Sequence, residues 1–164
     1  MRQQKVITDL LGTSGIQTIG ATTAVTRTAV AVADEIANAI ADVVTYSGRT
    51  ANAIVMTPEI WKLLRIGKNA ENDYYGGGYF SALHGNNIWN LPIVLSNQLT
   101  TNHILVGAFD TCASLVTKAE GVTVEATNTN EDDFIYNLMT IRAEVREKLA
   151  CRIPAGFVDI TVSS

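Results

Sequence analysis

The chain has 164 residues, 47% of them hydrophobic and 17% charged, with a formal net charge of −4. This composition predicts a packed globular protein of one domain or two small lobes and excludes a disordered chain. The acidic balance argues against a protein whose main task is to bind nucleic acid, since such proteins carry basic patches. No apolar run reaches the ~20 residues of a membrane span and no signal segment follows Met1, so we expect a cytosolic protein.

The first part of the chain predicts a connecting segment followed by a helix. Residues 6–20 contain two glycine breaks and look like a connection. From Val32 onward the apolar residues recur at helical spacing. Either Thr26 or Thr28 is suited to cap the start of this helix, and Gly48 can adopt the left-handed conformation that ends it.

A buried strand and a second helix follow. Residues 52–56 are short and apolar, as in a buried strand. The sequence Thr57-Pro58-Glu59 then combines a capping hydroxyl, a proline at the first turn and an acid near the positive end of the helix dipole. We expect the second helix to begin here and to end at Gly67.

Residues 69–87 predict a long polar loop that contains the tyrosines Tyr74, Tyr75 and Tyr79. Loops longer than about 12–15 residues in a compact domain are usually functional or disordered. The glycine run 76–78 does not form a phosphate-binding loop, because no Lys-Ser or Lys-Thr pair follows it.

The rest of the chain is rich in predicted strands. The stretch 88–96 reads as a strand interrupted by Pro92, hence an edge strand or one that starts after the proline. A helical turn is expected at Asp110 and a polar turn at 128–133. Further strands are expected at 103–107, 113–117, 122–126 and 157–162. Mixed helices and strands with a strand-rich end favour the α+β class.

The most regular pattern in the sequence is residues 139–153, where apolar and polar residues alternate. Period two indicates a half-buried strand, and this one is long against the usual 5–6 residues. A helix remains the alternative, because some of its apolar residues also recur every four positions. The charged side chains share one face of the strand, and either solvent or a neighbouring copy of the protein can cover them. They are Arg142, Glu144, Arg146, Lys148 and Arg152.

Catalytic and metal-binding patterns are not evident. The two histidines, His84 and His103, lie at no metal-ligand spacing from Cys112 and Cys151, so we expect neither a metal nor a cofactor. The two cysteines are expected to be small buried hydrophobes rather than a disulfide. The residues alone therefore predict an α+β protein that is not an enzyme.

Five segments, in order, resemble motifs of the tailed-bacteriophage major capsid protein family, which has the Hong Kong 97-type fold. Ser14 stands where the family usually has proline. The segments are LLGTSGIQT at 10–18, AIVMTPEIW at 53–61, IWNLPIVLS at 88–96, VGAF at 106–109, and a fifth made of 121–125, 137–144 and 154–158.

The resemblance implies an axial domain with a mixed sheet flanked by helices, and a peripheral domain with long antiparallel strands. It assigns residues 1–20 to a connecting segment, 21–118 to the axial domain, 119–153 to the peripheral strands and 154–164 to a final strand that returns to the axial domain. Only the family's C-terminal half is matched. We expect this chain to be a truncated product that lacks the family's N-terminal arm, extended loop and spine helix.

The function implied is that of a structural subunit of a virus or prophage icosahedral capsid, which acts by self-assembly. Its partners would be other copies of itself in rings or shells, with packaged DNA contacted only indirectly and no membrane. Its location would be the virion, after assembly in the host cytoplasm. One alternative is the shell protein of an encapsulin-type nanocompartment. Another is a small-molecule-binding enzyme with residues 69–87 as a lid over a deep pocket.

The resemblance also suggests contact residues. Arg142, Glu144, Arg146 and Lys148 on the long strand would face neighbouring subunits, and Tyr74, Tyr75 and Tyr79 would approach the five- and six-fold axes. We also expect weak self-association through exposed strand edges.

Some members of the family crosslink subunits through a Lys–Asn isopeptide bond assisted by a glutamate. Asn137 and Glu144 match the asparagine and glutamate positions, although the lysine-bearing loop is missing from the chain. Seven residues apart on one strand, they would point to opposite faces. An inter-subunit salt bridge of Glu144 is the alternative.

Overall fold

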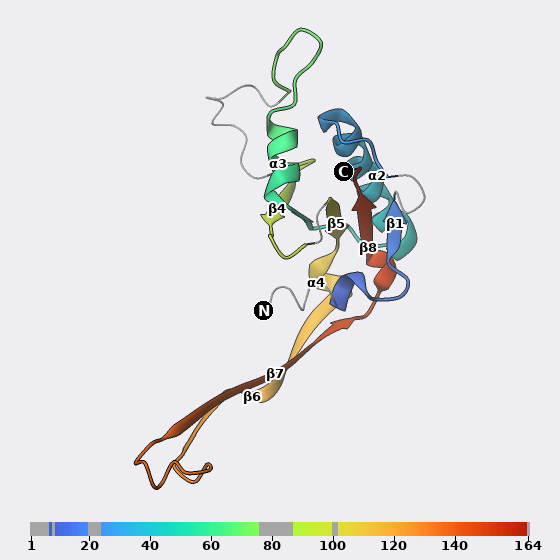
Figure 1. Ribbon diagram of the computed structural model, residues 1–164. Helices are drawn as coiled ribbons and strands as arrows, with labels where there is room; N and C mark the ends of the chain where they lie inside the picture. Colours follow the sequence, from blue (N-terminus) through green and yellow to red (C-terminus); the bar gives the residue numbers. More distant parts are fainter. Residues whose placement is uncertain (1–6, 8, 20–23, 76–86, 100–101, 164) are drawn as a thin grey trace. The chain divides into compact units, whose positions relative to one another are not determined.

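The computed structural model describes residues 7, 9–19, 24–75, 87–99 and 102–163 (Figure 1). The chain divides into two compact units, one made of residues 1–114 and 151–164 and the other of residues 115–150. Among the described helices, none combines the length and the apolar character that crossing a membrane requires. The mixed helices and strands confirm the α+β class.

The first unit is organised on helix α2 (Ala29–Ser47). Thr28 caps its start, because its hydroxyl oxygen accepts a hydrogen bond from the Ala31 amide at 3.3 Å. Gly48 ends it in the left-handed conformation, with φ of 64°, as the sequence predicted. The apolar stripe of α2 is buried, namely Val32, Ile36, Ala39 and Val43.

Six strands form the sheet of this unit, in the order β1-β8-β5-β2-β4-β3. The pairs β1–β8 and β2–β4 are parallel, whereas β2–β5, β5–β8 and β3–β4 are antiparallel. The sheet is therefore mixed. Its strands are β1 (Gln17–Ile19), β2 (Ala53–Met56), β3 (Asn87–Ile88), β4 (Leu91–Leu95), β5 (His103–Gly107) and β8 (Phe157–Thr161).

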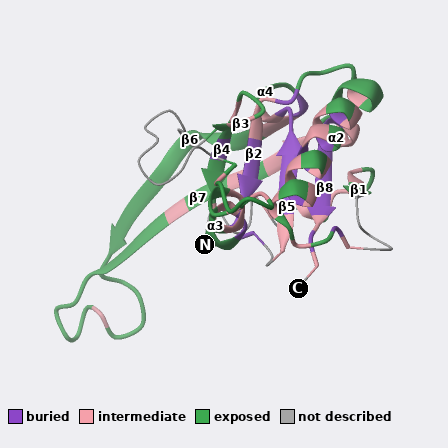
Figure 2. Ribbon diagram, turned by 90° about the horizontal axis from the view of Figure 1, so that it is seen from above, coloured by how far each residue is buried: buried purple, intermediate pink, exposed green. Residues whose placement is uncertain are grey.

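The core lies where α2 packs against the central strands β5 and β8 (Figure 2). Strand β8 is buried along most of its length, and Phe157 is fully buried. The ring of Phe157 packs edge-on against Phe109, with centroids 5.2 Å apart. Gly107 leaves room for that ring, because a Cβ atom there would overlap Phe157 and lie 2.9 Å from the Gly156 carbonyl oxygen.

Helix α3 (Pro58–Arg65) begins at the predicted proline but lacks the predicted side-chain cap. The Thr57 hydroxyl makes no hydrogen bond to the helix and is buried without a partner among the described residues. The helix is held instead by packing, since Ile60 is fully buried. It ends at Arg65, slightly before the predicted end at Gly67.

The predicted strand 88–96 is two strands joined by a tight turn. Strands β3 and β4 pair through Ile88 and Leu91, so Trp89 and Asn90 form a two-residue loop. Both loop residues have positive φ, 46° and 64°, as in a type I′ hairpin. Pro92 lies inside β4, and the prediction of a start after the proline is wrong. The turn was missed because tryptophan is an unusual residue at positive φ.

The second unit consists of two strands and the segment that joins them. Strand β6 (Ala113–Thr127) pairs with β7 (Thr140–Cys151), and the 15 residues of β6 join the two short strands predicted at 113–117 and 122–126. The strand predicted at 139–153 is confirmed as a strand, and the helical alternative is wrong. The first unit also contains the short helix α4 (Phe109–Cys112) and the 3₁₀ turn η1 (Pro154–Gly156).

Candidate functional site

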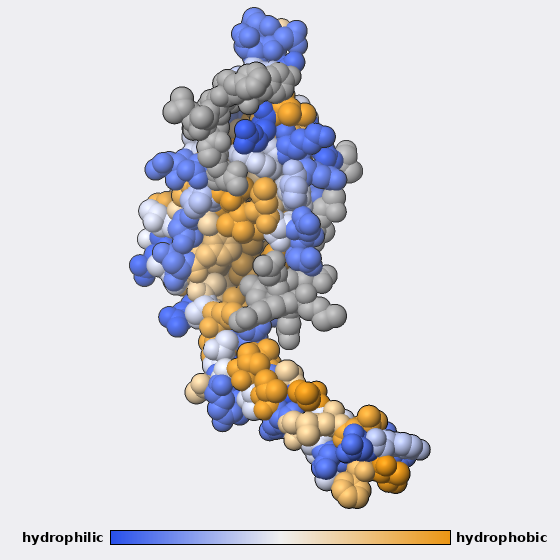
Figure 3. All heavy atoms as spheres, turned by 90° about the vertical axis from the view of Figure 1, so that its left-hand side faces the viewer, coloured by the Kyte–Doolittle hydropathy of each residue, from blue (hydrophilic) through white to orange (hydrophobic). Residues whose placement is uncertain are grey.

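The hairpin of β6 and β7 exposes its apolar residues. Val124 and Ile141, with 64% and 67% of their surfaces exposed, represent a row that also includes Val122 and Val145. The prediction that this strand is half-buried is therefore wrong for the chain as described. Figure 3 shows hydrophobic side chains at the surface of the hairpin. Contiguous exposed apolar surface usually marks an interaction site.

The opposite face of the hairpin is polar. Its side chains line one shallow groove of about 160 Å³, and they alternate with the apolar row along each strand. On β6 the polar positions are even before Gly121 and odd after it, and Gly121 itself has φ of 67°. Such a change of parity is that of a β-bulge, and it keeps the charged side chains of β6 on one face. The groove is lined by Lys118, Glu120, Thr123, Glu125, Arg142, Glu144 and Arg146.

The charges of this groove neutralise one another. Arg142 on β7 lies 2.6 Å from the carboxylate of Glu125 on β6. Arg146 pairs with Glu144, and Lys118 pairs with Glu120.

The Arg146–Glu144 pair also affects the ionisation of the Glu144 carboxyl group. The hydrogen bond that the Arg146 guanidinium donates, and then its positive charge, lower the pKa of Glu144. Glu144 is therefore ionised at neutral pH, and the face offers little net charge to a partner.

The tip of the hairpin, residues 128–139, is a folded turn with an apolar surface. Backbone hydrogen bonds close it, including Ile135 to the Asp132 carbonyl at 3.0 Å and Leu138 to the Asp133 carbonyl at 2.8 Å. Its large side chains are exposed and follow directly on an acidic run, residues 131–133. Tyrosine, present here as Tyr136, is one of the residue types enriched at the energetic centres of protein interfaces. The exposed side chains of the tip are Phe134, Ile135, Tyr136, Leu138 and Met139.

Comparison with known proteins identifies the family. Residues 8–162 match the sequence model of the Phage capsid family. The chain belongs to the phage capsid family. It is also 36% identical, over 132 residues, to the major capsid protein of Enterobacteria phage HK97, a match that covers 80% of this chain and 34% of the relative. The chain thus spans about a third of the length of that relative.

Solved structures show the same fold at low sequence identity. A chain of Mycobacterium phage Che8 matches with a TM-score of 0.73 and 20% identity, covering 97% of this chain and 57% of that one. A virus-like particle from Pyrococcus furiosus matches with a TM-score of 0.67 and 15% identity, covering 97% and 61%. These likenesses confirm the fold expected from the family resemblance.

The strand residues predicted as capsid subunit contacts lie near one another. Arg142, Glu144 and Arg146 line the same groove, and Lys148 is exposed further along β7. Intramolecular ion pairs occupy the first three. Their role between subunits stays a prediction.

The two positions that match the family's crosslink are placed differently from our expectation. Asn137 lies in the tip with φ of 54°, and β7 begins only at Thr140. The premise that Asn137 and Glu144 share one strand is therefore wrong, and the argument from opposite faces does not hold. The crosslink itself stays a prediction.

The loop tyrosines are only partly described. Tyr74 is half-buried and lies under the Lys68 ammonium, which is 4.6 Å from its ring centroid. Tyr75 is exposed, and Tyr79 lies outside the described residues. Part of the predicted loop is a compact turn, because the Asn69 side chain accepts hydrogen bonds from two later amides.

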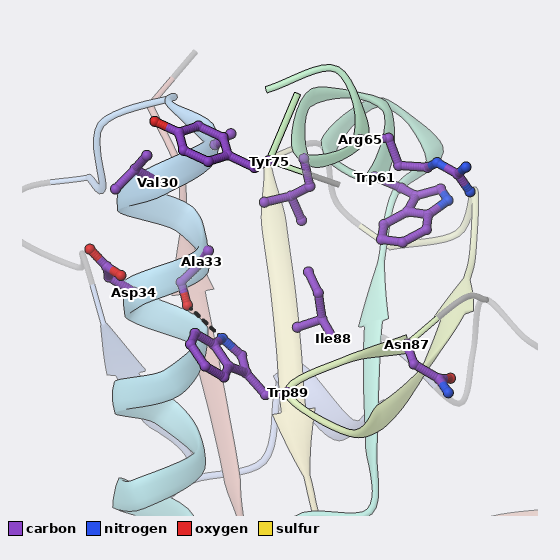
Figure 4. Close-up of a pocket in the computed structure, with 11 residues that line it drawn as sticks. Val30, Ala33, Asp34, Trp61, Arg65, Tyr75, Asn87, Ile88 and Trp89 are labelled. Carbon is purple, nitrogen blue, oxygen red and sulfur yellow. Dashed lines mark hydrogen bonds between the residues drawn. The ribbon is translucent and has the colours of Figure 1, made fainter. Parts of the chain in front are cut away.

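The first unit also contains an open cleft of about 620 Å³ between α2, α3 and the β3–β4 turn (Figure 4). Trp89 lies against α2 and donates a hydrogen bond from Nε1 to the Ala33 carbonyl oxygen at 3.0 Å. Trp61 and Arg65 form the facing wall, and Asp34 lies on the α2 side. Most of the lining is apolar, so the cleft suits an apolar side chain better than a polar substrate.

One polar pair was missed by sequence reasoning. The Nδ1 atom of His103 lies 2.9 and 3.0 Å from the two carboxylate oxygens of Asp159. Asp159 is buried in β8, where an acid within an apolar run was the available signal for a partner. His84 lies outside the described residues. Among the residues that the structure describes, no cluster of acids, histidines and cysteines is arranged to bind a metal.

Proposed function

We propose that this chain is part of the subunit of a viral or prophage capsid and acts by self-assembly rather than catalysis. The observation that carries this proposal is the hairpin, which exposes an apolar face while its charged face is neutralised internally. When a partner covers exposed valine and isoleucine side chains, each Å² of apolar surface that is buried contributes about 25 cal/mol of favourable free energy. The family match supports other copies of the same protein as that partner.

In this proposal the first unit corresponds to the family's axial domain and the hairpin to its peripheral domain. The charged groove residues would set the geometry of contacts more than their affinity. The protein would reside in the virion, with its assembly in the host cytoplasm. DNA contact would be indirect, in keeping with the acidic charge. The encapsulin alternative has less support, since the matched family is that of phage capsids.

The test uses a hairpin variant and sedimentation velocity with negative-stain electron microscopy. Replacing both Val124 and Ile141 with threonine removes apolar surface from the exposed face and keeps β-branched residues suited to strands. We expect the parent chain to associate with rising concentration and the double variant to associate at least tenfold more weakly.

The matched control is Ile66→Thr, at an apolar residue of the first unit that is also exposed, to 52%. It should associate like the parent. Equal association of all three chains, or a parent that stays monomeric up to about 1 mM, contradicts the proposal.

A further inference from the structure

The cleft of the first unit collects exposed apolar residues. Of the large hydrophobic side chains exposed in this unit, Val30, Tyr75 and Trp89 line the cleft. Trp89 is held there at a backbone cost, since a bulky residue at φ of 46° is an outlier. Its bond to Ala33 fixes the indole against α2, and 59% of the residue remains exposed. Such strain tends to persist at functional positions.

A second exposed patch lies at the other end of α2, at Tyr46. The Tyr46 side chain is exposed in the last turn of the helix, and Arg49 follows just after the Gly48 cap. A helix of 19 residues is about 28 Å long, so this patch and the cleft lie at opposite ends of one rigid element. Two different patches on one molecule are what a head-to-tail contact between copies requires.

Charge complements the apolar fit. Asp34 lies on the α2 side of the cleft, and Arg49 follows Tyr46 by three positions in the chain. Both side chains are exposed, and neither makes an ion pair within the described part of the chain. On the facing wall Arg65 is already engaged, because its guanidinium lies over the Trp61 ring at 5.6 Å. The free acid and the free base are therefore available to each other in neighbouring copies.

We propose that the Tyr46 side chain of one copy inserts into the Trp61–Trp89 cleft of the next copy, where Arg49 pairs with Asp34. The inference rests on the proposed function in assuming self-assembly, and it names a contact that the hairpin does not make. A tyrosine buries roughly 150–250 Å² and keeps its hydroxyl at the wet rim. The cleft volume of about 620 Å³ is larger than a tyrosine side chain. Repetition of this contact closes a ring or extends a chain.

The test is a charge swap read by sedimentation velocity. The Asp34→Arg chain and the Arg49→Asp chain should each associate about tenfold more weakly than the parent, because like charges then meet at the contact. An equimolar mixture should recover the parent's association, since each contact in an alternating ring again joins opposite charges. Asp110→Arg, at an exposed acid away from the cleft, is the control for net charge and should match the parent.

A second variant tests the cleft without charge. Val30→Trp should fill the cleft and weaken association, whereas Tyr46→Phe should retain it. Parent-like association of Asp34→Arg and Val30→Trp would overturn the inference.

Other outcomes separate this inference from the proposed function. If only the hairpin variant weakens association, this contact is overturned and the proposed function stands. A parent that remains monomeric overturns both. If Val30→Trp leaves association unchanged but abolishes binding of the hydrophobic dye ANS, the cleft is a small-ligand site and the inference fails.

Discussion

The Arg142 guanidinium on β7 lies 2.6 Å from the Glu125 carboxylate on β6, and this ion pair joins the two strands of the hairpin. The other two pairs on this face connect residues two positions apart on a single strand. Arg142 and Glu125 are both well exposed, with 67% and 60% of their side-chain surfaces accessible. The pair therefore orients the strands without contributing much free energy, and the apolar face is left to drive association.

A double-mutant cycle on Arg142→Ala and Glu125→Ala should give a coupling energy of about 0.2–1 kcal/mol. Because the hairpin is a separate compact unit, hydrogen exchange of its own amides is the suitable measurement. The coupling should shrink at about 1 M salt, where the Debye length is about 3 Å. A coupling energy above about 2 kcal/mol, or one that does not change with salt concentration, would show that the pair is effectively buried.

Gly107→Ala should destabilise the first unit by about 1–3 kcal/mol, because the added methyl group overlaps the Phe157 ring in a packed core. Urea unfolding followed by far-UV circular dichroism measures this change.

Gly48→Ala tests backbone strain without steric overlap. A Cβ atom at this position meets nothing within 4 Å, but the backbone has φ of 64°. This substitution should lower the free energy of unfolding by about 1 kcal/mol, and Gly48→Asn should lower it less.

For the other glycine, a Gly107→Ala protein as stable as the parent would mean that Phe157 can shift freely.

The sequence predicted elements wherever local chemistry decides them. Thr28 and Gly48 bound α2 through capping alone, and Pro58 begins α3. The alternation across 140–151 made β7 recognisable as a strand. In the candidate site, alternation likewise placed Arg142 and its charged neighbours on one face.

What the sequence could not predict depends on residues that are distant in the chain. The turn at Trp89 is stabilised by the Ala33 carbonyl, 56 positions away in the chain. Alternation could not show that the apolar face of β7 is exposed, because a period of two separates the two faces of a strand without saying what packs on either. The sequence also could not predict that His103 is the partner of Asp159, because the two residues lie on different strands.

Asp159→Asn should destabilise the first unit by about 1–3 kcal/mol, because it removes a charge-assisted hydrogen bond from a buried position between β5 and β8. The free energy of unfolding in urea, near neutral pH, checks the size of the loss. His103→Ala should cost less once Asp159 is already asparagine, since the two changes remove one interaction. Additive losses in the double variant would show that the two side chains stabilise the fold independently.

The acid behaviour of the hairpin follows from Glu144. Its pKa lies below the ordinary 4.5 because Arg146 donates a hydrogen bond to the carboxylate and adds a positive charge beside it. A lowered pKa in the folded hairpin means that this contribution to stability is present above about pH 4.5 and is lost as the pH falls through the folded value.

Carboxyl-carbon NMR of Glu144 should therefore give a titration midpoint below that of an unpaired glutamate. Arg146→Gln should raise the midpoint toward the ordinary value, and Arg142→Gln should raise it less, because Arg142 acts only through its charge. Equal midpoints in the parent and the Arg146→Gln chain would mean that the ion pair is not populated in solution.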